Sequence, residues 1–125
     1  MRVVAENVLG SGPVISARVS EDGAQAFIRW ESVTYKPTNR LAATRELMLT
    51  EAQLVTGSVI GQLSPIERIR FTIVKQGRML ATGENRRGGG VIVMFSKEIG
   101  GGVARPTSSK RDPDRPRGGE AAREL

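Results

Sequence analysis

The sequence predicts an all-β fold, a small antiparallel sandwich or barrel that ends in an extended C-terminal arm. Three observations lead to this prediction: short stretches alternate apolar and polar residues, turn signals containing Gly or Asp separate them, and the end of the chain is rich in Pro, Gly and charge. Because successive side chains of a strand point to opposite faces, such alternation indicates strands that are buried on one side. Regular turns between short strands are typical of sandwiches and barrels.

The first two expected strands form a hairpin. Residues 13–20 (PVISARVS) and 24–32 (AQAFIRWES) both alternate, and the segment EDGA at 21–24 is a turn signal. Two strands joined by a tight Asp-Gly turn pair in antiparallel fashion. The apolar face of this hairpin is expected to carry Ile15, Ala17, Val19, Ala26, Ile28 and Trp30.

The next stretch allows two interpretations. Residues 34–40 are expected to form a loop or an edge strand, because Pro37 cannot donate a hydrogen bond to a sheet. The Ala, Leu, Met and Glu content of residues 41–55 favours a helix. Residues 45–50 (RELMLT) also fit a short strand, and we prefer the strand.

The second half of the chain is expected to contribute the remaining strands. In residues 67–76, Ile69, Phe71 and Ile73 alternate with polar residues, so these three side chains are expected in the core. The segment GENRRGGG at 83–90 is expected to be a glycine-rich loop. The strands are expected at 57–63, at 67–76, in the segment that returns after a turn at 76–78, and at 91–99.

Two passages resemble fibronectin type III and related immunoglobulin-like sandwiches. That family carries G-x-x-A-x-V-x-W in its second strand and L-x-P-x-x-x-Y-x-F-x-V before its sixth, and this chain has GAQAFIRW at 23–30 and LSPIERIRFTI at 63–73. The resemblance implies that Leu63 and Pro65 plug the corner between two sheets, with Ile69 in place of the usual tyrosine.

The resemblance covers roughly residues 13–83. It predicts an immunoglobulin-like β-sandwich domain at 1–103, followed by an arm at 104–125. Another all-β fold is the alternative.

A sandwich of this kind is similar to accessory modules of tailed-phage virions, such as capsid decoration proteins, head–tail connectors and tail proteins. The resemblance implies a non-enzymatic structural protein that is multimeric in an assembly, with capsid or tail subunits as its partners. Its expected location is the virion, or the cytoplasm before assembly. The N-terminal stretch RVVAENVLG is too short and polar for a signal peptide, and no apolar run approaches the roughly 20 residues of a membrane span.

The net charge of +6 lies mainly toward the C-terminal end. Residues 1–85 hold 10 basic and 8 acidic groups, whereas residues 86–125 hold 9 and 5. A nucleic-acid-binding module that uses the Gly/Arg loop and the basic arm is therefore the alternative function. The candidate partner-binding residues are Arg86, Arg87, Arg105, Lys110, Arg111, Arg115 and Arg117.

The composition of residues 104–125 predicts an extended arm, because it cannot bury enough apolar surface to offset the entropy of ordering. Acidic residues interrupt its basic run, and no aromatic residue is interleaved to stack on bases. Three roles stay open for the arm: a solvated tail, a segment that docks on protein, and a contact to nucleic acid.

No catalytic, cofactor or metal site is predicted. The chain has no Cys and no His, which removes disulfides, thiolate and imidazole chemistry and the usual zinc sites. The acidic residues Glu21, Asp22 and Glu31 have no recognisable acid–base or metal-ligand spacing. The segment at 83–90 lacks the Gly-Lys-Ser/Thr ending of a phosphate-binding loop.

Overall fold

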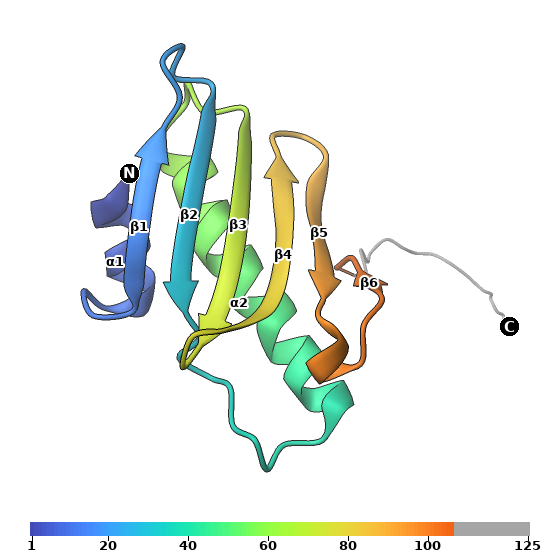
Figure 1. Ribbon diagram of the computed structural model, residues 1–125. Coiled ribbons are helices and arrows are strands. Elements are labelled where there is room, and N and C mark those ends of the chain that lie inside the picture. Colours follow the sequence, from blue (N-terminus) through green and yellow to red (C-terminus); the bar gives the residue numbers. More distant parts are fainter. Residues whose placement is uncertain (107–125) are drawn as a thin grey trace, which may run out of the picture.

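The computed structural model describes residues 1–106 (Figure 1). A short N-terminal helix precedes a β-hairpin, a long helix follows it, and a run of strands completes the fold. In chain order the elements are α1 (Arg2–Leu9), β1 (Val14–Val19), β2 (Gln25–Glu31), α2 (Leu41–Gln62), β3 (Arg68–Lys75), β4 (Arg78–Arg86), β5 (Gly90–Phe95), the 3-10 helix η1 (Lys97–Ile99) and β6 (Val103–Ala104).

The strands form one mixed six-stranded sheet in the order β1-β2-β3-β4-β5-β6. All neighbouring strands are antiparallel except β2 and β3, which are parallel. Parallel neighbours need a crossover connection, and α2 provides it. Figure 1 shows α2 crossing behind the sheet, with α1 on the same side next to β1. The helices therefore cover one face of the sheet and leave the other open.

The core lies between α2 and the sheet. Trp30 of β2 and Phe71 of β3 are both buried, and their rings stack with centroids 5.6 Å apart. Ala26, Ile28, Ile69 and Ile73 lie on the same face in register with them, so the predicted alternation of β2 and β3 is confirmed. The helix contributes Met48, Ala52, Val55 and Val59 to this core.

The expected β-rich character and the antiparallel hairpin of β1 and β2 are confirmed. The two-sheet arrangement of a sandwich is not found, because residues 1–106 form a single sheet and helices occupy the side where a second sheet would pack. On β1 the predicted apolar face is only partly buried. Ile15 is 50% exposed beside an irregularity in pairing between Val14 and Ser16, and Val19 is 44% exposed on this edge strand.

Residues 41–62 form one helix of 22 residues, so the strands expected at 45–50 and 57–63 are wrong. The helical period is hidden because apolar residues occur all around α2. Val55 faces the sheet, whereas Leu54 is 56% exposed on another side. A stretch without a polar face does not show the 3.6-residue period from which an amphipathic helix is recognised.

The passage that resembles a sandwich corner is instead the end of α2. The backbone N–H of Leu63 donates to the carbonyl of Val59 at 2.9 Å and closes the last turn. Pro65 follows, exposed, in the turn that leads into β3. A proline shortly after a helix C-terminus is common because it cannot continue the helix, which accounts for the L-x-P spacing.

The expected glycine-rich loop at 83–90 is mostly strand. β4 continues to Arg86 and β5 begins at Gly90, so only residues 87–89 turn the chain. Gly83 lies inside β4, where a Cβ atom would stand 2.1 Å from the carbonyl oxygen of Ile92 and 2.7 Å from the Phe71 ring. This glycine permits close packing inside the sheet. The strand expected over 91–99 ends at Phe95 and is followed by η1.

Glu51 of α2 is a buried carboxylate that ties the segment after β2 to the helix. Its Oε1 accepts a hydrogen bond of 3.0 Å from Trp30 Nε1. Its Oε2 accepts bonds from Ser32 Oγ at 2.6 Å, from the Thr34 backbone N–H at 3.0 Å and from the Thr34 hydroxyl. These donors satisfy a group that is costly to bury alone.

Candidate nucleic-acid interface

The open face of the sheet carries the side chains that alternate with the core residues. Because α2 covers the other face, these residues point to solvent, and the strand register arranges them in two cross-strand rows. The first row holds Arg18, Phe27, Arg70, Glu84 and Ile92, one from each of β1 to β5. The second row holds Ser16, Arg29, Thr72, Thr82 and Met94.

Basic side chains outnumber acidic ones on this face. It holds the five arginines Arg18, Arg29, Arg68, Arg70 and Arg86, and the glutamates Glu31 and Glu84. Among the described residues, Arg86 is the one arginine of this face that is in an ion pair, with Glu84 at 3.1 Å. Within residues 1–106 the side chains of the other four arginines make no ion pair and no hydrogen bond. The described part of the chain therefore supplies no carboxylate partner for these four charges.

Two of these arginines stand opposite each other. Arg68 of β3 and Arg86 of β4 are cross-strand partners, an arrangement of like charges that destabilises a sheet. Glu84 offsets only part of this repulsion. An anion bound between the two guanidinium groups would relieve the rest.

Phe27 provides an aromatic surface on the same face. It is half-buried, and the guanidinium carbon of Arg18 lies 4.2 Å from the centre of its ring. An arginine over an aromatic ring is a stacking platform that also holds positive charge. In the first row, Phe27 lies directly between Arg18 and Arg70.

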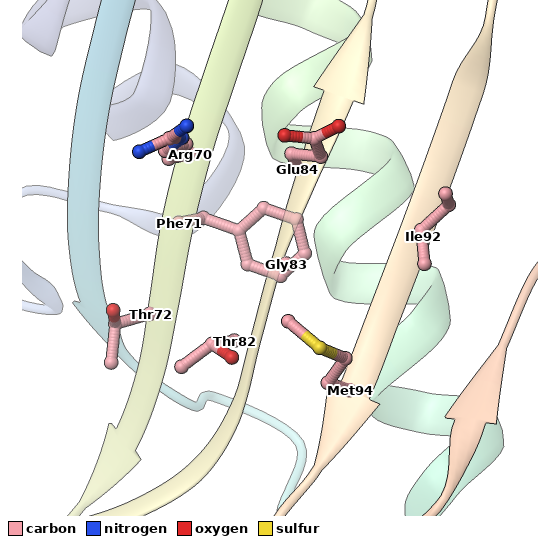
Figure 2. Close-up of a pocket in the computed structure, with 8 residues that line it drawn as sticks. All are labelled: Arg70, Phe71, Thr72, Thr82, Gly83, Glu84, Ile92 and Met94. Atoms are coloured by element: carbon pink, nitrogen blue, oxygen red, sulfur yellow. The ribbon is translucent and has the colours of Figure 1, made fainter.

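Two adjoining hollows cross the open face. The larger, of about 570 Å³, lies over β3, β4 and β5 (Figure 2). The smaller, of about 240 Å³, lies over β1, β2 and β3. Both include Arg70, Phe71 and Thr72, so β3 is the boundary between them. Together they form a shallow trough that crosses the strands.

The larger hollow has different chemistry at its two ends. Figure 2 shows Arg70 and Glu84 near each other at one end, with Thr72, Thr82 and Met94 at the other. Ile92 lies on the β5 side. Phe71 and Gly83 lie between the two rows and line the floor. The hollow thus offers apolar contact, hydroxyl groups, a cation and a carboxylate.

The structure places the candidate residues from the sequence in three different surroundings. Arg86 lies on the open face. Arg87 lies in the turn after β4, where its guanidinium donates to the carbonyls of Ile60, Leu63 and Ile66. Arg105 follows β6 and is exposed. Lys110, Arg111, Arg115 and Arg117 lie outside the described residues.

The sequence analysis placed the basic surface near the C-terminal end and identified only Arg86 among the five arginines of the open face. Counted along the chain, the charges of residues 1–85 nearly balance. The available signal was the alternation itself, which puts Arg18, Arg29 and Arg70 opposite the core residues of their strands. The order of the strands brings these three arginines together, and the alternation does not predict that order.

Within the described part of the chain, no helix has the length and apolar character that crossing a membrane requires. In residues 1–106 no three or more acidic side chains gather into a group that could hold a metal ion. Comparison with family models, with curated proteins and with solved structures finds no match to this chain.

Proposed function

We propose that this protein is a non-enzymatic module that binds single-stranded nucleic acid on the open face of its sheet. The observation that carries the proposal is the group of four arginines, Arg18, Arg29, Arg68 and Arg70, that have no ion pair or side-chain hydrogen bond within the described residues. The planar guanidinium group forms paired hydrogen bonds to phosphate groups as it does to carboxylates.

The surroundings of the arginines favour a nucleic acid over another polyanion. Phe27 lies among them and offers a ring on which a base can stack, and Ile92 and Met94 add apolar contact. The hollows lie on a sheet face, a geometry that presents rings to bases splayed out of a strand. In a duplex the bases are paired and stacked, so their faces are not available. A single strand is therefore the expected ligand.

The first test is binding of a fluorescent eight-nucleotide single strand and of a duplex of equal length, measured by anisotropy. We expect the single strand to bind more tightly. Its affinity should fall by roughly 50-fold between about 50 and 200 mM salt if four phosphate contacts form, since each contributes a slope of about −0.7. Absence of binding at 50 mM salt would reject the proposal.

The second test assigns binding to the sheet. The double variant Arg18→Gln with Arg70→Gln removes two charges from the open face, and Arg40→Gln with Arg78→Gln removes two from elsewhere. We expect the first pair to weaken binding at least tenfold and the second to have little effect. An equal loss in both pairs would mean that only net charge attracts the strand.

We propose a structural role in a tailed-phage virion as a second candidate function, although residues 1–106 form one sheet and not the immunoglobulin-like sandwich on which the expectation rested. One observation favours a protein contact: on the helices, Val3 and Leu54 are 66% and 56% exposed. Such apolar side chains are suited to docking on a subunit. The test is association with purified capsid or tail subunits at micromolar concentration. A chain that stays monomeric and binds none of them would reject this role.

A further inference from the structure

We infer that the hollow over β3, β4 and β5 selects a base that carries an exocyclic amino group, and that Glu84 is the residue that reads it. The inference rests on the proposed function, because it names what the trough binds. It predicts a preference for cytosine over uracil among single strands of the same length.

Glu84 is placed to accept a hydrogen bond from a base in the hollow. It lines the hollow, is only half-buried, and lies across from Arg70 in the strand register. One of its oxygens, Oε2, accepts from Arg86 Nε at 3.1 Å, which holds the carboxylate while the other oxygen makes no hydrogen bond within residues 1–106. An ionised carboxylate has only acceptors to offer.

Glu84 and Arg70 together present an acceptor and a donor to a base in the hollow. Arg70 stands across from Glu84 and has only donors. The pairing edge of cytosine has the complementary order, with an amino donor next to ring nitrogen and carbonyl acceptors. Uracil presents a carbonyl where cytosine has its amino group, and that oxygen would face the lone pairs of Glu84. A Glu carboxylate that accepts a hydrogen bond from the amino group of cytosine is an established base contact.

The rest of the hollow can hold a flat ring, but it does not distinguish cytosine from uracil. Ile92 and Met94 supply apolar contact, and the hydroxyls of Thr72 and Thr82 can donate or accept. Cytosine and uracil have the same ring size, so shape and stacking treat them almost alike. The difference between the two bases is therefore assigned to the end of the hollow that holds Glu84.

The experiment compares the oligoribonucleotides C8 and U8 by anisotropy at about 50 mM salt, with the wild-type chain and two matched variants. Glu84→Gln replaces the carboxylate by an amide, which both donates and accepts. Glu31→Gln makes the same change of charge on the same face, but Glu31 does not line the hollow. Both glutamates are on the solvent side of the sheet, so melting temperatures close to wild type are expected for both variants.

We expect the wild-type chain and Glu31→Gln to bind C8 about tenfold more tightly than U8, and Glu84→Gln to bind both with similar affinity. Equal binding of C8 and U8 by the wild-type chain overturns the inference and leaves the proposed function standing. A preference that survives in Glu84→Gln also overturns it. If neither strand binds, the proposed function itself fails.

Discussion

Glu51 has neighbours that are all hydrogen-bond donors, and this decides what a substitution would do. Trp30 Nε1 donates to one carboxylate oxygen, and Ser32 and Thr34 donate to the other. Glu51→Gln keeps the shape of the side chain but replaces one carboxylate oxygen by an NH2 group. In either orientation of the amide, this NH2 group faces the donor of Trp30 or those of Ser32 and Thr34. We expect a loss of roughly 1–3 kcal/mol in the free energy of unfolding, measured by urea denaturation.

The control for this prediction lies on the same helix. Glu46 is exposed and makes no side-chain hydrogen bond within the described residues, so Glu46→Gln should change stability by less than about 0.5 kcal/mol. Equal stability of the two variants would show that the hydrogen bonds to Glu51 contribute nothing to the fold.

Gly83 is a second residue whose surroundings decide what a substitution would do, because they leave no room for a side chain. An added methyl group would meet the Ile92 carbonyl oxygen and the Phe71 ring, so β5 or the ring must move. Gly83→Ala should lower the free energy of unfolding by roughly 1–3 kcal/mol. Gly12→Ala is the control, because a Cβ at Gly12 meets nothing within 4 Å. Similar thermal midpoints for the two variants would contradict the packing at Gly83.

At the scale of elements, α2 carries two glycines that no packing explains. A Cβ at Gly57 or Gly61 would meet nothing within 4 Å, and neither has a positive φ. Because glycine costs about 1 kcal/mol relative to alanine inside a helix, Gly57→Ala and Gly61→Ala should each raise stability by up to that amount.

The matched control for the helix glycines is in the turn between β3 and β4. Gly77 also has open space around it, but its φ is 78°. Gly77→Ala should destabilise the protein by about 1 kcal/mol, since a left-handed conformation is strained for alanine. If all three substitutions shift the thermal midpoint in the same direction, backbone conformation is not what distinguishes these sites.

Arg86 and Arg87 are neighbours in sequence with different tasks. Arg87 donates to the carbonyls of Ile60 and Leu63 at the C-terminal end of α2 and to that of Ile66 beyond it, so Arg87→Gln should cost roughly 1–3 kcal/mol of stability. Arg86 is exposed and pairs only with Glu84, so Arg86→Gln should leave stability nearly unchanged.

The two substitutions should affect the binding of a single strand in the reverse order of their effects on stability. Arg86→Gln is expected to weaken it, because Arg86 belongs to the open face, and Arg87→Gln is expected to change it little in the folded protein. The two measurements are chemical denaturation and anisotropy. A loss of stability in Arg86→Gln and none in Arg87→Gln would reverse the assignment.

At the scale of the whole molecule, the buried core that residues 1–106 form lies between Val4 and Ile99. A chain shortened to residues 1–106 should therefore unfold within about 0.5 kcal/mol of the full chain. If the basic residues beyond 106 contact phosphates, the shortened chain should also bind a single strand with a shallower dependence on salt. An unchanged salt dependence would exclude Lys110, Arg111, Arg115 and Arg117 as contacts.

Which side of β2 and β3 enters the core can be predicted from the sequence alone. The period of two is a local property of each strand, so the positions of Trp30 and Phe71 and the antiparallel hairpin could be predicted without knowing the partners of these strands. The sequence also removed the chemistry of Cys and His. The residues now placed on the open face were visible as the polar half of the same alternation.

The remaining features follow from contacts between segments that are distant in the chain. α2 is apolar on several sides, so its period was hidden, and its place as the crossover follows only from the parallel pairing of β2 and β3. That crossover places Arg70 beside Phe27, which lies far from it in the chain, whereas the β3–β4 hairpin places Arg70 across from Glu84. The candidate site depends on strand order, and strand order is set by contacts between distant segments, which a local pattern does not record.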